Sequence, residues 1–196
     1  MKKLIPLFFL ILFIQTLNIS AGNSNEIKRI IIGNKDAKIS IIAYESLTCS
    51  HCANFHIDVL PKLKKEYIDT GLAKIEFRHF PLDVAAFNAS KIVQCKNDGS
   101  SEILNSLYFN QSKWIKGNTI EKVNENLKQF LVSEGIKVDF YKCTTDKSIE
   151  NFILNDRIEG VKKFKVNATP TIIINDKKFE KSLNYKNLKK TLEKLI

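Results

Sequence analysis

The pattern of apolar positions changes character twice along the chain. Runs of β-branched and aromatic residues indicate strands early and late in the sequence, at 27–32, 39–44, 74–78, 171–174 and 178–179. Between them, from about residue 83 to 165, apolar residues recur every three or four positions, the period of helices with one buried face. The pattern predicts an α/β fold in which residues 83–164 form a helical insertion between residues 22–82 and 165–196.

A helix is also predicted directly after the second strand. Apolar residues recur at helical spacing from Phe55 to Tyr67. Pro61 lies within this stretch, and because proline has no N–H to donate, it predicts a kink there.

Two helix boundaries follow from local signals. Ser148 precedes apolar residues that begin at Ile149 with helical spacing, so it is a candidate N-cap. The last helix is expected from Tyr185 to Ile196, with Leu195 on its apolar side.

The first residues have the pattern of an export signal. Two lysines follow Met1, and the apolar stretch 4–14 is shorter than the roughly 18 to 20 residues that a membrane-spanning helix needs. Small residues at 20–22 predict cleavage after Ala21, so residues 1–21 are assigned as a signal peptide. The alternative is an uncleaved anchor. Export would place the protein in the periplasm or its equivalent.

Composition excludes several classes of protein. With 196 residues, of which 44% are hydrophobic, the chain can bury a core, which excludes disordered and fibrous proteins. The formal net charge is +10, but only three of the 31 basic residues are arginine, and no dense basic run with interleaved aromatics occurs. Nucleic-acid binding is therefore not expected. A lysine-rich surface with some affinity for anionic partners is expected instead.

The strongest chemical signal is the C-x-x-C motif of Cys49 and Cys52 at the strand-to-helix junction. A helix N-terminus stabilises a thiolate, which is the nucleophile of disulfide exchange, and His51 can add a positive charge or a hydrogen bond. Cys49 is the predicted nucleophile, and Cys52 can then attack a mixed disulfide formed on Cys49. The alternatives are an inert structural bridge or half of a zinc site.

The other two cysteines, Cys95 and Cys143, most simply pair with each other. Such a bond would close a loop of about 48 residues and stabilise the fold by about 4 kcal/mol. The alternative is two buried free thiols. Zinc binding by all four cysteines is disfavoured because a helical segment separates these two and because an exported protein meets an oxidising compartment. No metal or cofactor is predicted.

Thr169 and Pro170 open the strand at 171–174. Proline is tolerated at the first residue of a strand. A cis bond here would expose the Thr169 backbone for strand-like pairing with a peptide substrate. Taken alone, the dipeptide would by default be an ordinary trans turn proline.

The whole order of elements resembles the thioredoxin fold with the helical insertion of DsbA-like thiol–disulfide oxidoreductases. The resemblance rests on residues 44–52 around the cysteine motif, residues 77–82 before the insertion, and residues 166–171 around Pro170. Cys95 and Cys143 lie where a subgroup that includes alphaproteobacterial members carries a second disulfide.

The resemblance implies a function and roles for the site. Cys49 would be the nucleophile, Cys52 the resolving cysteine, and Thr169 with a cis Pro170 the wall of the substrate site. The protein would introduce disulfides into reduced or unfolded exported proteins, and a membrane reoxidase would regenerate it. The alternatives are a disulfide isomerase or reductase, or a peptide-binding chaperone-like module.

Two departures from the family pattern concern the site. Many thioredoxin-fold proteins have a buried acid six residues before the first cysteine, where this chain has Ala43. Glu45 is expected on the same side of the strand and is a candidate proton acceptor, unless it is a surface carboxylate. Ser50 stands in place of the familiar proline between the cysteines. His56 and His79 are expected to be packed or surface histidines.

Overall fold

The computed structural model describes residues 26–196, so the predicted signal peptide 1–21 lies outside the described part. Within residues 26–196, five strands form one sheet in the order β1-β3-β2-β4-β5. Their bounds are β1 (Ile30–Gly33), β2 (Ile39–Glu45), β3 (Ala73–His79), β4 (Thr171–Ile174) and β5 (Lys177–Lys178). β2 and β3 are parallel, and the other neighbouring pairs are antiparallel. The α/β fold is therefore as the sequence predicted.

The central strand β2 has two faces because its side chains alternate. Ile41 and Ala43 belong to the larger hydrophobic core, whereas Tyr44 belongs to a smaller cluster on the other face. Alternation places Glu45 on the same face as Ala43. The last residue of the strand thus points toward the helix that carries the cysteine motif.

One irregular helical stretch follows β2 and packs on the larger core. Its parts are α1 (Ser50–Asn54), the π-helical turn η1 (Phe55–Val59), α2 (Leu60–Leu63) and the π-helical turn η2 (Lys64–Ile68). Pro61 lies in the first turn of α2, directly after η1. The regular helix is therefore interrupted close to the position that the proline predicted, because the missing N–H removes a hydrogen bond of the i to i−4 ladder.

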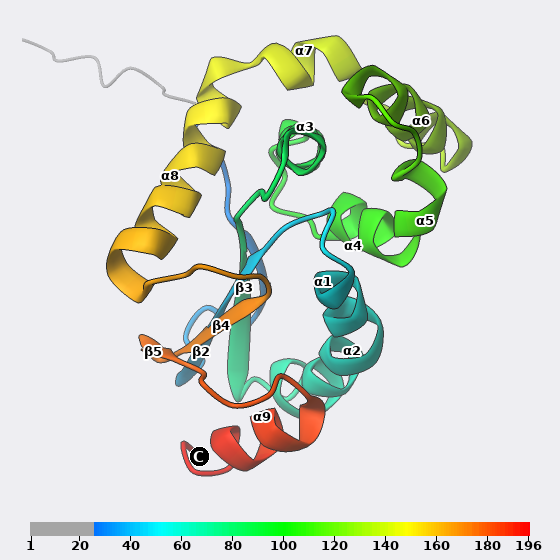
Figure 1. Ribbon diagram of the computed structural model, residues 1–196. Helices are drawn as coiled ribbons and strands as arrows, with labels where there is room; N and C mark the ends of the chain where they lie inside the picture. Colours follow the sequence, from blue (N-terminus) through cyan, green and yellow to red (C-terminus); the bar gives the residue numbers. More distant parts are fainter. Residues whose placement is uncertain (1–25) are drawn as a thin grey trace, which may run out of the picture.

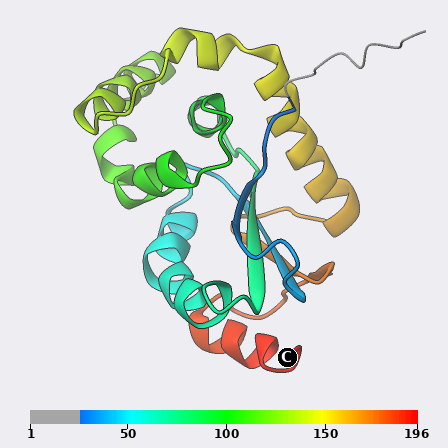
Figure 2. The same cartoon turned by 180° about the vertical axis from the view of Figure 1, so that it is seen from behind.

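The helical segment between β3 and β4 forms an arch beside the sheet (Figure 1). It consists of α3 (Val84–Cys95), α4 (Glu102–Phe109), α5 (Gln111–Trp114), α6 (Ile120–Ser133), α7 (Phe140–Thr145) and α8 (Lys147–Phe164). Seen from behind, α8 lies on the opposite side of the sheet from α1 and α2 (Figure 2). The terminal helix α9 (Tyr185–Leu192) packs beside α2.

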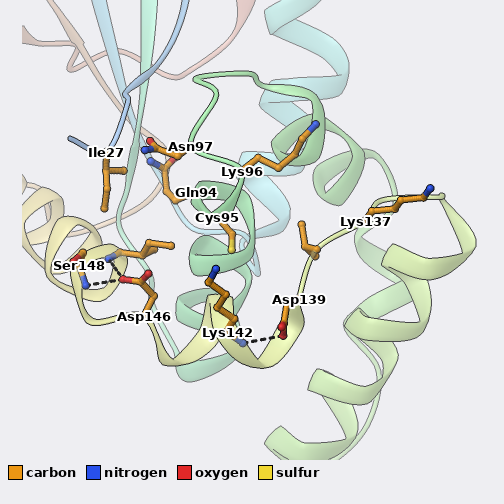
Figure 3. Close-up of a pocket in the computed structure, with 12 residues that line it drawn as sticks. Ile27, Gln94, Cys95, Lys96, Asn97, Lys137, Asp139, Lys142, Asp146 and Ser148 are labelled. Atoms are coloured by element: carbon orange, nitrogen blue, oxygen red, sulfur yellow. Dashed lines mark hydrogen bonds between the residues drawn. The ribbon is translucent and has the colours of Figure 1, made fainter. Parts of the chain in front are cut away.

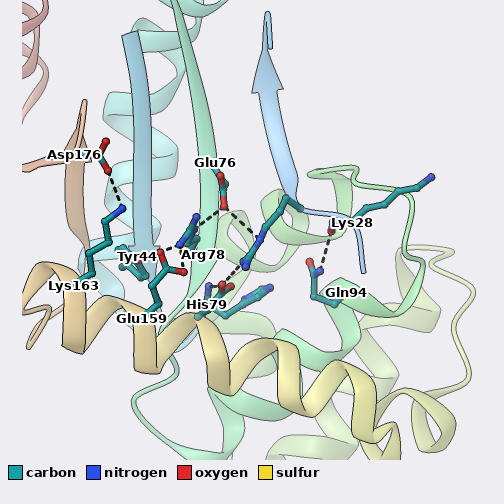
Figure 4. A network of polar contacts seen from close by, with 11 residues as sticks. Lys28, Tyr44, Glu76, Arg78, His79, Gln94, Glu159, Lys163 and Asp176 are labelled. Carbon is teal, nitrogen blue, oxygen red and sulfur yellow. Dashed lines mark hydrogen bonds and ion pairs between the residues drawn. The ribbon is translucent and has the colours of Figure 1, made fainter. Parts of the chain in front are cut away.

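Helix α8 approaches the sheet closely at Gly160. A Cβ atom there would lie only 2.8 Å from the Tyr44 ring, so any larger residue would push the helix away. Polar contacts hold the rest of this interface (Figure 4). Glu159 forms an ion pair with Arg78 at 2.6 Å. Buried Asp156 accepts a hydrogen bond from the His79 backbone N–H at 3.1 Å.

Two predicted helix boundaries are wrong. Asp146, and not Ser148, is the N-cap of α8, because its extended backbone lets Oδ1 accept the N–H groups of Ser148 at 2.8 Å and Ile149 at 3.1 Å. Helix α9 ends at Leu192, and the Leu195 side chain beyond it is 40% exposed. Within residues 26–196, no helix is both long and apolar enough to cross a membrane.

Candidate functional site

The C-x-x-C motif lies where the loop after β2 enters α1. Cys49 is the N-cap residue, with extended backbone angles, and its carbonyl accepts the N–H groups of Cys52 at 3.1 Å and Ala53 at 3.2 Å. Both cysteines are free thiols; Cys49 is partly exposed, whereas Cys52 is 0% exposed. The outer cysteine is thus accessible at a helix start, and the inner one is enclosed.

The environment stabilises a thiolate on Cys49. Its pKa is lowered to about 5, first of all by a hydrogen bond from the Cys52 thiol, against the opposing effect of burial. The Thr169 side chain and the backbone N–H groups of Cys52 and His51 lower this pKa further. Burial is the main reason why the pKa of Cys52 is strongly raised. One thiol of the pair is therefore ionised near neutral pH, and the other is protonated.

The Thr169–Pro170 peptide lies against Cys49 and is cis, as the family resemblance implied. The Cys49 thiol donates a hydrogen bond to the Thr169 carbonyl at 3.3 Å. The Thr169 hydroxyl is buried and has no other hydrogen-bond partner among residues 26–196. It is therefore free to donate to Cys49 once that residue is a thiolate.

A cleft of about 450 Å³ opens beside the cysteines. Thr169 and Pro170 line it together with His51, Phe55 and Asp58. The structure thus brings His51, Thr169 and Pro170 together around one cleft beside the cysteine pair. His51 lowers the pKa of Cys49 through its backbone N–H, as expected of a residue in the first turn of a helix.

The helical segment supports the loop that ends at Cys49. Gln111, from α5, donates its side-chain N–H groups to the Leu47 carbonyl at 2.7 Å and the Cys49 carbonyl at 3.0 Å. The Thr48 hydroxyl donates to Asp83 at 2.7 Å. No signal in the sequence pointed to Gln111, because nothing in local spacing shows that α5 returns to this loop.

Behind Cys52 lies a buried pair of polar side chains. Glu45 is 3% exposed and His56 is 1% exposed, and Glu45 Oε2 lies 2.8 Å from His56 Nε2. The possibility that Glu45 is a surface carboxylate is therefore wrong. His56 is packed, as expected, but its partner was not foreseen.

Comparison with known proteins decides the family. A family model described as Thioredoxin matches residues 25–194. The chain belongs to the thioredoxin family. Alpha-DsbA1 of Wolbachia pipientis is 30% identical, with a TM-score of 0.75 over 85% of this chain and 90% of that protein. BdbD of Bacillus subtilis has the same fold, with a TM-score of 0.69 at 21% identity over 85% of this chain and 92% of that one. The expected DsbA-like thioredoxin fold is confirmed.

Similar sequences come from Rickettsia. A protein of Rickettsia bellii named a protein-disulfide oxidoreductase is 31% identical over 148 residues, which are 74% of this chain and 56% of that protein. A Rickettsia prowazekii protein with the same name is 29% identical over 170 residues, which are 85% of this chain and 61% of that protein. The chain thus spans little more than half the length of these relatives.

The second cysteine pair of this thioredoxin-family protein is a disulfide. Cys95 and Cys143 are bonded, with their Cα atoms 5.4 Å apart. This pairing agrees with the prediction and removes both residues from any metal site with Cys49 and Cys52. A cavity of about 690 Å³ lies beside Cys95, lined in part by Lys96 and Lys142 (Figure 3).

Proposed function

We propose that the chain is a protein thiol–disulfide oxidoreductase that passes the Cys49–Cys52 disulfide to exported proteins. A substrate thiolate attacks Cys49 Sγ, the Cys49–Cys52 bond breaks, and Cys52 leaves with the electron pair. A second substrate thiolate then attacks the substrate sulfur of the mixed disulfide. The substrate leaves oxidised, and the enzyme is left with two thiols.

The observation that carries this proposal is the contrast between the two thiols. The pKa of Cys49 is lowered to about 5, whereas the pKa of Cys52 is raised. A stabilised Cys49 thiolate favours the reduced enzyme over the disulfide form. An enzyme whose reduced form is stabilised is a strong oxidant and donates its disulfide readily.

The surface around Cys49 supports a protein substrate. In the proposed complex, an extended segment of a reduced or unfolded protein pairs with the Thr169 backbone, and Pro170 forms the wall of the site. The cleft lined by His51 and Phe55 can receive side chains of that segment. The export pattern of residues 1–21 supports action in the periplasm, where a membrane reoxidase would restore the Cys49–Cys52 disulfide.

The reduction potential of the Cys49–Cys52 pair tests the proposal. It is measured by equilibrating the protein in glutathione buffers, with a Cys95→Ser/Cys143→Ser variant so that only one pair reports. We expect a value of about −120 mV, as in strongly oxidising members of this fold. A value of about −270 mV, as in thioredoxin, would indicate a reductase or isomerase instead. If no dithiol–disulfide equilibrium exists, the peptide-binding chaperone-like alternative gains support.

A further inference from the structure

The positive charge of the protein is distributed unevenly along the chain. Residues 165–196 contain eight lysines and three acidic residues, a net charge of +5, which is half of the formal net charge of +10. The helical segment 83–164 contains 12 basic and 11 acidic residues and is nearly neutral. The excess charge is therefore concentrated in β5, α9 and the loops around them.

Helix α9 presents its lysines to water because its apolar side belongs to the core. Both leucines of this helix are 0% exposed, and the helix packs beside α2. Lys186 and Lys190 lie one turn apart on the outer side and are exposed. Neither of them forms an ion pair with a residue between 26 and 196, whereas Lys189 pairs with Glu66 at 2.7 Å. The amines of Lys186 and Lys190 are thus available to a partner.

A hollow with mainly apolar walls lies directly beyond the end of α9. It measures about 210 Å³, and Leu72 and Leu195 line it with side chains that are 38% and 40% exposed. Lys38 lines the same hollow, and Lys194 precedes Leu195 in the chain. Exposed leucines thus lie beside exposed lysines, a combination that the core and the cysteine site do not require.

Exposed amines around this hollow outnumber the carboxylates. The acidic residues are Asp36, which lines the hollow, and Glu193, which precedes Lys194. Lys35, Lys38 and the last two lysines of the chain are exposed, and within residues 26–196 none of these four has an ion-pair partner. We call this surface the basal face, and it consists of Lys38, Leu72, Lys190, Lys194 and Leu195.

The basal face lies at the end of the sheet opposite to the cysteine motif. Lys38 directly precedes β2 and Leu72 directly precedes β3, and these two parallel strands start at the same end. The loop to Cys49 follows the other end of β2. Figure 1 shows α9 at the end of the molecule remote from the helical arch. A partner on the basal face therefore leaves the cleft beside Cys49 open.

We propose that the basal face docks reversibly on the surface of an anionic lipid bilayer. The lysine amines approach the phosphate headgroups, and Leu72 and Leu195 enter the headgroup layer, as in other proteins that bind membrane surfaces. Lysine suits the diffuse charge of headgroups, whereas bidentate recognition of carboxylates on an acidic protein favours arginine, which does not occur in residues 165–196. Docking holds the protein at the membrane with Cys49 directed away from it.

Sedimentation with lipid vesicles at low ionic strength tests the proposal. The protein is used without residues 1–21, as the predicted cleavage leaves it, because the apolar stretch 4–14 would bind lipid by itself. The five-stranded sheet lies within residues 26–196, so this form keeps the fold. One set of vesicles contains equal amounts of phosphatidylglycerol and phosphatidylcholine, and the other contains phosphatidylcholine alone. We expect binding only to the first set, and it should weaken as salt screens the charges.

Lys38→Gln/Lys190→Gln/Lys194→Gln removes three amines of the basal face. All three side chains are exposed, so the replacements leave the core packing as it is. An amine close to an anionic bilayer strengthens binding about fivefold, so this variant should bind the phosphatidylglycerol vesicles at least about 30-fold more weakly than the native protein.

Lys128→Gln/Lys137→Gln/Lys142→Gln is the matched control. These three lysines are also exposed and have no ion-pair partner among residues 26–196, but they belong to the helical segment. The control loses the same net charge as the variant of the basal face. It should bind the vesicles within about threefold of the native protein, because charges far from the bilayer are screened.

Fluorescence of Leu195→Trp reports whether the leucines enter the headgroup layer. Trp114 is the one tryptophan of the chain and is 0% exposed, so its emission should stay constant. Emission of the new indole should shift to shorter wavelength on phosphatidylglycerol vesicles, because tryptophan prefers the membrane–water interface. Leu72→Ser/Leu195→Ser should weaken binding about tenfold, since less apolar surface leaves water.

Three results would each overturn the proposal: equal binding to both sets of vesicles or to neither, equal binding by the two triple lysine variants, or an unchanged emission of Leu195→Trp. Binding of a polyglutamate peptide in place of vesicles, lost in the variant of the basal face, would assign this face to an acidic protein and also overturn it. Cys49→Ser should bind the vesicles as the native protein does, so the outcome is independent of the proposed exchange function.

Discussion

The molecule holds two cysteine pairs in opposite environments. Cys49 is the N-cap residue of α1, where unpaired N–H groups and the positive end of the helix dipole favour a thiolate. Cys95 is the last residue of α3, where the dipole has the opposite sign, and its partner Cys143 is 0% exposed. The first pair comprises neighbours on one helical turn, whereas the second joins residues 48 positions apart.

The reactivity of a cysteine therefore depends on its position in the fold, since all four residues are of the same type. A cysteine at a helix start, with its partner one turn away, can lose and regain its disulfide without moving the backbone far. A cysteine at a helix end, bonded to a distant helix, contributes mainly by tying α3 to α7. The first pair should therefore control exchange, and the second should control stability.

The largest expected effect is the loss of exchange in Cys49→Ser. Without the nucleophilic thiolate, oxidation of a reduced peptide substrate should fall by at least about 10³-fold, since the remaining groups only bind and orient. The rate is measured with a peptide whose two thiols are followed by a thiol reagent. Cys95→Ser/Cys143→Ser is the comparison, and it should keep the rate within a few fold. A comparable loss in that double variant would contradict the division of roles.

The free energy of unfolding should depend more on the Cys95–Cys143 pair than on Cys49. Replacing both Cys95 and Cys143 with serine should lower the free energy of unfolding by up to about 4 kcal/mol, because the unfolded chain loses a long-range cross-link. Urea denaturation of the double variant, beside the native protein with its Cys95–Cys143 bond intact and Cys49→Ser, measures this difference. The idea fails if the double variant unfolds at the same urea concentration as the native protein.

The site shows how far sequence alone reaches. The strand, the C-x-x-C motif and the helix after it were predictable, because apolar period and cysteine spacing are local signals. So was the pairing of Cys95 with Cys143, since only two cysteines remained. The contact of Glu45 with His56 was not predictable, although Glu45 had been singled out as a candidate proton acceptor. Periodicity tells which side of an element is buried, but not which polar groups meet there.

The helix boundaries likewise show that local sequence patterns do not determine every contact. Asp146 and Ser148 lie two positions apart, and both are residue types that can cap a helix N-terminus. Asp146 is the N-cap because its backbone is extended, whereas Ser148 already lies inside the first turn of the helix. The end of α7 at Thr145 sets that backbone, and no local pattern reveals it.

A smaller effect is expected at the substrate side of the first pair. In Thr169→Val, the hydroxyl that lowers the pKa of Cys49 is replaced by a methyl group of similar size. A hydrogen bond to a charged group contributes about 1.5 to 3 kcal/mol, so the pKa of Cys49 should rise by about 1 to 2 units.

The pH dependence of alkylation measures this shift. Since the thiolate is the reactive form, the native rate should fall as pH drops through about 5, the pKa of Cys49. The profile of Thr169→Val should move to higher pH, while its fully ionised rate stays similar. Thr191→Val, at a half-buried position of α9, serves as a control for threonine replacement. An unmoved profile in Thr169→Val would show that the hydroxyl does not reach the thiolate.

The smallest effect is expected where the helical segment touches the active-site loop. Gln111→Leu removes the two N–H groups that bind the carbonyls of Leu47 and Cys49. Each lost hydrogen bond costs about 1 kcal/mol, so the loop should loosen and the N-cap position of Cys49 become less fixed. The pKa of Cys49 should rise by a fraction of a unit, and exchange should slow by a few fold.

Gln129→Leu is the matched control for Gln111→Leu, because the exposed side chain of Gln129 donates to Glu125 on the same helix and lies away from the cysteine loop. It should leave alkylation, exchange and stability as they are. If Gln111→Leu lowers stability but leaves the alkylation profile in place, the helical segment stabilises the loop without tuning the nucleophile. If it moves the profile, the insertion acts on the first cysteine pair as well as holding the second. The contrast between the two pairs would then be one of degree, because the same helical segment would serve both.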